Sequence, residues 1–331
     1  VVDQPNSIPE INSRENFRRR LELASENSYC HFGINGYVSE NSDFSGLIDE
    51  GVLAFGEMFA AASSYGNALT PEVIKKSLRI LADCNMLVTV HAETVSSTDV
   101  HSLKEHCSSR DADGEVSAIK FVNSLAPKNA RLHYCHISSA KSISEISGTF
   151  EAAPHHLFLN YEDAQSNDTL FKMNPPLRTK KEQTELLSRF NEIPVIASDH
   201  APHTLDDKSA EFSKAPSGVP GVETMMPLLM NAVYEKKISL NSVIEKTVVN
   251  PCRILNISRP DLAVGCRADL CVYDDRPIKI RAENLHSKAG WTPYENMYGI
   301  FPYITIINGT AVWNKGEFEK PDVLWFRSKT D

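Results

Sequence analysis

Four side chains that can bind a metal ion or move a proton stand at the ends of short apolar segments. They are Glu57, His91, His136 and Asp199. The segment before Asp199, residues 194–197 (Pro-Val-Ile-Ala), is typical of a buried parallel strand. An α/β barrel gathers the C-terminal ends of its strands at one mouth, so residues far apart in sequence meet there. Imidazole and carboxylate groups are ligands of zinc, and Asp199 can also act as a general acid and base. The sequence therefore predicts a metal site with an adjacent proton carrier.

A structural interpretation competes with the metal site at each position. A loop aspartate such as Asp199 often caps the next turn. One strand-end histidine is usually structural, but two histidines and an acid at separate strand ends favour a metal. Side chains alternate along a strand, so we expect His133 to pack against the helices while His136 faces the mouth. The neighbouring His155 and His156 cannot both face the mouth, and we interpret them as packing residues or as supports for a ligand.

The elements that position these residues alternate between strand-like and helical segments, which indicates a parallel α/β sheet. Helix starts are indicated by Thr70-Pro71 and by the capping box from Thr179 to Glu182. The strand-like segments are residues 1–6, 30–34, 52–59, 87–91, 131–136, 150–155 and 194–199. We predict an α/β fold, a TIM-type (β/α)8 barrel over residues 1–257. Its first strand is expected to precede Val1, since the chain opens within a strand and without Met.

The C-terminal part has a different pattern, rich in short strands. Residues 268–273 are strand-like, and residues 304–313 form two strands about Asn308-Gly309, a strong hairpin signal. We therefore predict a small β subdomain with a C-terminal tail over residues 258–331.

Composition narrows the class of protein. The net charge of −9 provides no basic surface for nucleic acid or for a membrane. No apolar run approaches the roughly 18–20 residues of a membrane span. The seven cysteines are odd in number and form no Cys-x-x-Cys pair, which favours a reducing cytoplasm over a disulfide framework.

Several motifs together make the chain resemble the dihydroorotases of the cyclic amidohydrolase superfamily over nearly its whole length. They are Val2-Asp3-Gln4-Pro5-Asn6-Ser7, Val90-His91-Ala92-Glu93, Tyr134-Cys135-His136-Ile137-Ser138, Glu151-Ala152-Ala153-Pro154-His155-His156-Leu157, Met173-Asn174-Pro175-Pro176-Leu177-Arg178, Ser198-Asp199-His200-Ala201-Pro202-His203 and Ser217-Gly218-Val219-Pro220-Gly221-Val222-Glu223-Thr224.

The resemblance implies reversible closure of N-carbamoyl-L-aspartate to L-dihydroorotate in pyrimidine synthesis, with one or two zinc ions or another divalent metal. His91 and His136 match the histidines of one metal site. Asp199 matches the aspartate that binds the other metal and carries a proton between its hydroxide and the substrate nitrogen. The matched substrate-binding positions are Asn6, Asn174, His203, Pro220 and Gly221.

The sequence departs from the family pattern at two places. No His-x-His occurs in this chain, and that motif with its arginine would lie before Val1. Glu57 occupies the bridging position that is often a carboxylated lysine, so a single-metal site is an alternative to a two-metal bridge.

Other hypotheses remain open on the sequence alone. One is a different cyclic amidohydrolase, of the allantoinase or dihydropyrimidinase type. Another is a non-catalytic, dihydroorotase-like partner of an aspartate transcarbamoylase. The expected partner of the enzyme is its small-molecule substrate, and relatives suggest a homodimer.

Overall fold

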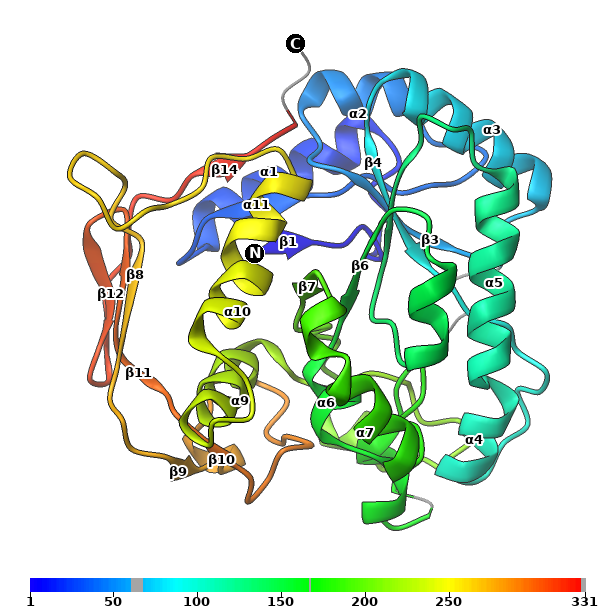
Figure 1. Cartoon of the computed structure of the whole chain (residues 1–331). Helices are drawn as coiled ribbons and strands as arrows, with labels where there is room; N and C mark the ends of the chain where they lie inside the picture. Colours follow the sequence, from blue (N-terminus) through cyan, green and yellow to red (C-terminus); the bar gives the residue numbers. More distant parts are fainter. Residues whose placement is uncertain (61–67, 167, 329–331) are drawn as a thin grey trace.

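The seven predicted strand segments form parallel strands, β1 to β7, and an eighth strand, β14 (Trp325–Phe326), also pairs in parallel with β2 (Figure 1). The computed structural model describes residues 1–60, 68–166 and 168–328. Strands β3 to β7 pair in chain order, β1 pairs with β2, and a bridge from Gly36 to Phe55 connects the two groups. The strands are β1 (Val2–Asp3), β2 (Phe32–Ile34), β3 (Phe55–Phe59), β4 (Leu87–His91), β5 (Arg131–Tyr134), β6 (Thr149–Ala152) and β7 (Val195–Ile196).

Helices connect successive strands and cover the outside of the barrel (Figure 1). The predicted N-caps form: Thr70 accepts from the amide of Val73, and Thr179 and Glu182 make a reciprocal capping box. The helices are α1 (Arg14–Asn27), α2 (Phe44–Glu50), α3 (Pro71–Asp83), α4 (Leu103–Ser109), α5 (Ala112–Leu125), α6 (Pro154–Phe158), α7 (Lys180–Ser188), α8 (Leu205–Lys208), α9 (Val222–Tyr234), α10 (Leu240–Ile244) and α11 (Asn250–Ile254).

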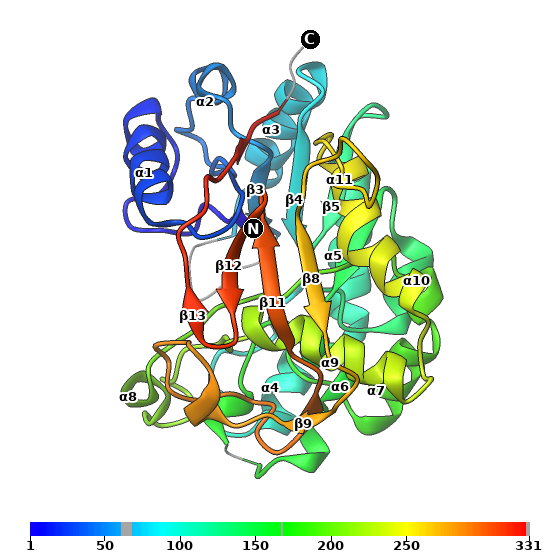
Figure 2. The same ribbon diagram turned by 90° about the vertical axis from the view of Figure 1, so that its left-hand side faces the viewer.

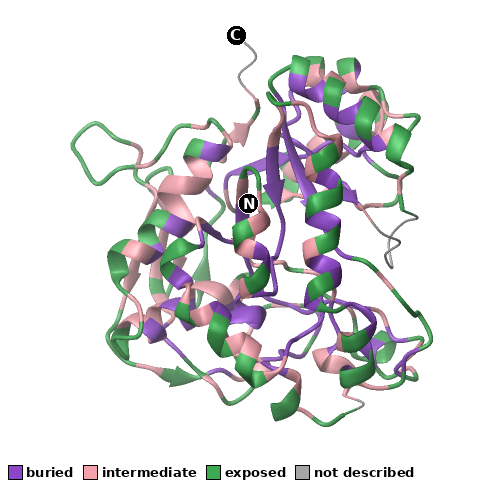
Figure 3. Ribbon diagram, turned by 45° about the vertical axis from the view of Figure 1, so that its right-hand side comes forward, coloured by how far each residue is buried: buried purple, intermediate pink, exposed green. Residues whose placement is uncertain are grey.

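The main core lies between the strands and the inner faces of these helices (Figure 3). Every residue of β4 is buried, as expected for a strand covered on both faces. On α3, Ile74, Leu78 and Leu81 are fully buried and recur at helical spacing. Burying each such side chain contributes roughly 1.5–3 kcal/mol, so the ends of the strands are held firmly.

The C-terminal part of the chain forms a separate antiparallel sheet, with its strands in the order β13-β12-β11-β8 (Figure 2). Its strands are β8 (Leu270–Tyr273), β11 (Pro302–Ile307), β12 (Thr310–Asn314) and β13 (Glu317–Phe318). The predicted turn is confirmed, since Asn308 and Gly309 have φ of 49° and 83°, both in the left-handed region that this turn requires. The boundary near residue 257 stays a prediction.

Three short strands complete the described structure: β9 (Ile278–Lys279) pairs with β10 (Tyr298–Gly299), and β14 (Trp325–Phe326) pairs with β2. None of the described helices combines the length and the apolarity needed to cross a bilayer.

Candidate active site and metal centre

Each predicted ligand lies on a barrel strand or on the loop that follows it. Glu57 is on β3, His91 ends β4, His136 follows β5 and Asp199 follows β7. Gly56 allows β3 to approach β4 closely: a Cβ there would lie 2.2 Å from the Thr89 carbonyl oxygen, and φ is +112°. A larger residue before Glu57 would push β3 away from β4, so the glycine helps to place the carboxylate beside the histidines.

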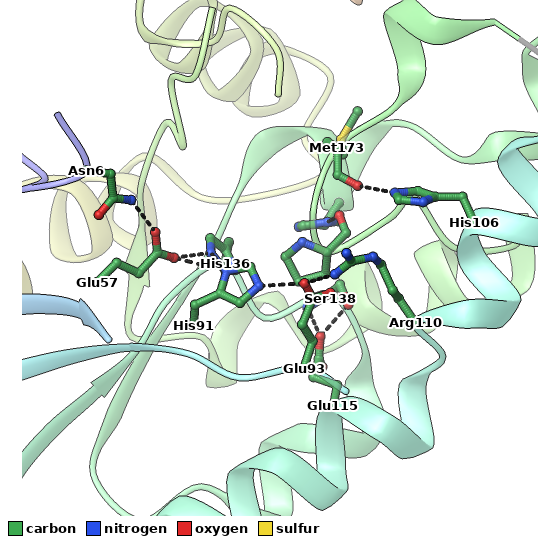
Figure 4. A network of polar contacts seen from close by, with 12 residues as sticks. Asn6, Glu57, His91, Glu93, His106, Arg110, Glu115, His136, Ser138 and Met173 are labelled. Carbon is green, nitrogen blue, oxygen red and sulfur yellow. Dashed lines mark hydrogen bonds and ion pairs between the residues drawn. The ribbon is translucent and has the colours of Figure 1, made fainter. Parts of the chain in front are cut away.

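Three of the predicted ligands converge on one point (Figure 4). Glu57 Oε1 lies 2.5 Å from His136 Nε2 and 3.2 Å from His91 Nδ1. The two ring nitrogens are 3.1 Å apart, and both histidines are buried. Two histidines and one glutamate are a ligand set that catalytic zinc sites use, with a further position left for water or substrate.

The ring orientation of His91 supports metal binding. Its Nε2 is 2.7 Å from Glu93 Oε1, and a buried carboxylate at that distance accepts the Nε2–H. In the neutral imidazole, which is the form that binds a metal, the lone pair of Nδ1 is then directed toward Glu57 and His136. Burial disfavours a charged imidazole, but Glu93 and Glu57 outweigh it and raise the pKa of His91 to about 10. The cluster thus favours a positive charge at this point, which fits a divalent cation.

Asp199 lies outside the group of three whose ligand atoms are within 4.8 Å of one another. Burial raises the pKa of Asp199 to about 6, although the nearby His136 opposes the shift. Asp199 and His136 also have positive φ, 44° and 37°, a strained conformation for non-glycine residues. Because neither residue is glycine, the surrounding structure must hold these two backbone positions in place.

Of the predicted substrate-binding residues, Asn6 contacts the cluster directly. Its amide nitrogen donates to Glu57 Oε2 at 3.3 Å, and its Oδ1 is buried without a hydrogen-bond partner. Asn174 Oδ1 is likewise buried and unpartnered. Two buried amide oxygens without partners are unusual in a folded protein and leave acceptors for a ligand.

The remaining predicted contacts lie on the loops after β7. His203 Nε2 is 3.0 Å from the Ser217 carbonyl oxygen. The Gly221 amide donates to His200 Nδ1 at 3.0 Å, and a Cβ at Gly221 would lie 2.6 Å from the Ser198 carbonyl oxygen. Only glycine allows that approach, but the role of Pro220, Gly221 and His203 in substrate binding stays a prediction.

His133 packs away from the ligand cluster, as alternation predicts: its ring nitrogens lie 2.8 Å from Thr149 Oγ1 and 3.0 Å from Glu151 Oε2. Sequence reasoning missed the partners of the ligands, above all Glu93 and Arg110. Glu93 stands two residues after His91 in the motif Val90-His91-Ala92-Glu93, and this spacing could have indicated it as a partner of that histidine. Arg110 has no comparable local signal.

The fold has close counterparts among solved structures. An L-hydantoinase (dihydropyrimidinase) from Arthrobacter aurescens matches with a TM-score of 0.91 and 22% identity, covering 98% of this chain and 80% of that one. A dihydropyrimidinase from Brevibacillus agri matches with a TM-score of 0.88 and 22% identity, over 99% of this chain and 80% of that one. At 22% identity these two structures show the fold alone. The class of protein, a metal-dependent cyclic amidohydrolase, is established by dihydroorotase relatives of 31–37% identity.

Curated relatives narrow the class further. A dihydroorotase of Methanosarcina acetivorans is 37% identical over 95% of this chain and 73% of its own length. A dihydroorotase of Halobacterium salinarum is 34% identical over 95% of this chain and 78% of its own length. No family model matches the chain. The chain belongs to the dihydroorotase family.

Proposed function

We propose that this protein is a zinc-dependent dihydroorotase that converts N-carbamoyl-L-aspartate reversibly to L-dihydroorotate. The observation that carries the proposal is the convergence of Glu57, His91 and His136 in a chain 31–37% identical to archaeal dihydroorotases. The barrel provides the mouth, and the cluster provides the ligands at its centre.

In this proposal Glu57, His91 and His136 hold one divalent ion, and we propose zinc because the ligand set is histidine and carboxylate. When bound, the ion supplies Lewis acidity and lowers the pKa of water from 15.7 to about 7. Glu57 keeps its charge in this role: burial favours the neutral acid, but His136 and His91 hold the pKa of this carboxyl well below its usual range.

Asp199 moves the proton. A pKa of about 6 leaves it able both to accept and to return a proton near neutral pH. In ring opening it takes a proton from the attacking water and delivers it to the ring nitrogen, and in ring closure the order reverses. Four positions around the mouth then hold the substrate: the amides of Asn6 and Asn174, the His203 ring, and backbone groups of Pro220-Gly221.

A substrate panel on the purified, zinc-supplemented full chain tests the function. L-dihydroorotate, hydantoin, allantoin and dihydrouracil are each followed for ring opening, and carbamoyl aspartate for closure. We expect turnover of the dihydroorotate–carbamoyl aspartate pair with a kcat/KM well above the others. Turnover of a neutral ring without turnover of dihydroorotate would reassign the protein to another cyclic amidohydrolase.

We also propose a cytoplasmic setting, because all seven cysteines are free thiols. Assembly as a homodimer, or with an aspartate transcarbamoylase, extends the proposal. Size-exclusion chromatography with and without that partner tests the assembly, and turnover by the isolated chain would rule out a non-catalytic role.

A further inference from the structure

Three residues from the quoted motifs have no role in the proposed reaction, yet they gather behind the metal ligands. Glu93 follows His91, Ser138 follows His136, and Arg178 ends the segment that carries Asn174. Their side chains form one buried polar network together with Arg110 and Glu115 from neighbouring helical segments. Figure 4 labels four of its members, Glu93, Arg110, Glu115 and Ser138. Each of the five residues is at most 7% exposed.

The first half of the network holds His91. Glu93 accepts from His91 Nε2 at 2.7 Å, and the same carboxylate oxygen pairs with the Arg110 guanidinium. Glu93 is 1% exposed, so its hydrogen bonds to His91 and Arg110 form in a low dielectric, where they are strong. They hold the Glu93 carboxylate in one orientation. Since His91 donates its Nε2–H to Glu93, the other ring nitrogen, Nδ1, faces Glu57 and His136.

The second half holds the turn that carries His136. The Ser138 amide donates to Glu115 Oε2 at 3.1 Å, and the Ser138 hydroxyl also contacts that carboxylate. The Ser138 hydroxyl in turn accepts from Arg178 Nε and Nη2, at 3.0 and 2.8 Å. This anchor lies two residues beyond the strained backbone of His136, whose φ is 37°.

The two halves are joined. Arg178 Nη1 donates to the Arg110 carbonyl oxygen at 2.5 Å, and Arg178 Nη2 lies 3.7 Å from Glu115 Oε2. The network therefore contains two carboxylate–guanidinium pairs, Glu93–Arg110 and Glu115–Arg178, joined through the backbone carbonyl of Arg110. Moving one member of a buried charged network would leave another member without its partner, which is strongly unfavourable. The members of the network are therefore held in this arrangement.

We propose that this network is a positioning device for both histidine ligands, so that metal affinity depends on residues that do not touch the metal. Glu93 sets the tautomer and orientation of His91, and the Glu115–Ser138–Arg178 anchor sets the turn of His136. The proposal rests on the metal site of the proposed function, but it does not depend on which ring is the substrate.

The test is the zinc affinity of the full chain, measured by competition with a chelator. We expect Glu93→Gln to weaken zinc binding about 10- to 100-fold, the range found for groups that orient metal ligands. Ser138→Ala keeps every charge and is the safer variant for folding. It is expected to weaken zinc binding several-fold and to lower the thermal midpoint of the metal-free protein somewhat, since Arg178 loses a buried acceptor.

Asp269→Asn is the matched control. Asp269 accepts from His31 Nε2 at 3.1 Å and pairs with Arg267, which repeats the histidine–carboxylate–arginine chemistry away from the cluster. This variant should retain the zinc affinity of the parent.

Three outcomes decide the proposal. Weakened zinc binding in Glu93→Gln and Ser138→Ala but not in Asp269→Asn supports it. Parental zinc affinity in both network variants, or an equal loss in Asp269→Asn, overturns it. If the parent chain binds zinc but opens no dihydroorotate, the proposed function fails while the positioning proposal still stands on its own measurement.

Discussion

His155 Nε2 lies 3.5 Å from Asp199 Oδ2, and no other basic side chain of the described residues comes within 4.0 Å of that carboxylate. His155 is fully buried, and burial lowers its pKa to about 3, so the imidazole is neutral. Neither of its ring nitrogens has a hydrogen-bond partner at standard distance. A neutral imidazole has one N–H, and Asp199 is the acceptor in reach. We therefore predict that His155 orients the proposed proton carrier.

Replacing His155 with leucine should reduce kcat about 10- to 100-fold, on the low side of what loss of a general acid–base costs, with little change in KM. The carboxylate of Asp199 stays present but loses its orientation. Steady-state kinetics on the folded fraction measure this. The adjacent His156 is the control, because its Nε2 contacts the Pro175 carbonyl oxygen at 3.0 Å. His156→Gln should lower stability and leave kcat near the parental value; equal losses of kcat in both variants would contradict a specific role for His155.

Asp199→Asn should lose about 100- to 10,000-fold in kcat, because an amide cannot accept and return the proton. Its comparison variant is His133→Ala, which removes a buried histidine bonded to Thr149 and Glu151 rather than to the cluster. We expect that variant to be less stable but active per folded molecule. Similar, mild effects in the two variants would remove Asp199 from the mechanism.

Glu57→Gln should abolish tight metal binding, because the variant replaces the only carboxylate in the described three-ligand cluster with a neutral amide. Metal content after dialysis against metal-free buffer measures the effect. Glu151→Gln provides a comparison, since that carboxylate contacts His133 instead of the ligands. Retention of a full equivalent of metal in Glu57→Gln would show that the ion binds elsewhere.

Stability should fall in acid partly through His106, which lies outside the ligand cluster. Its Nε2 is 3.0 Å from the Met173 carbonyl oxygen, and burial lowers its pKa to about 4. The unfolded chain, with an ordinary histidine pKa near 6.5, binds a proton more readily, so this contribution is complete above pH 6.5. It is lost as the pH falls toward 4 and is on the order of 3 kcal/mol.

Urea unfolding of the parent and of His106→Gln across pH 4–7 measures that contribution. The variant should show a smaller decrease in unfolding free energy between pH 6.5 and 4. Parallel curves for the two proteins would mean that His106 does not titrate between these limits.

Local patterns were sufficient to predict the barrel strands and the convergence of three candidate ligands; that these residues bind a metal stays a prediction. Glu57, His91 and His136 follow apolar runs, and the parallel sheet places the ends of those runs together. Alternation along β5 also separated His133 from His136. These features depend on strand periodicity, which is visible in a short stretch of sequence.

The supports of the site could not be predicted in this way. Arg110 caps the C-terminus of α4 and Glu115 lies on α5, and their contacts with Glu93 and Ser138 depend on how these helices pack against the barrel. The approach of His155 to Asp199 likewise depends on a contact across 44 positions. No periodicity in the sequence encodes such pairings, because they are set by tertiary packing.

The central claim is that Glu57, His91 and His136 together hold one catalytic metal ion. Anomalous diffraction at the zinc absorption edge, from crystals of the zinc-loaded protein, tests it most directly. We predict a peak within about 2.0–2.2 Å of Glu57 Oε1, His91 Nδ1 and His136 Nε2. A peak coordinated by other side chains, or the absence of any peak between these three atoms, would contradict it.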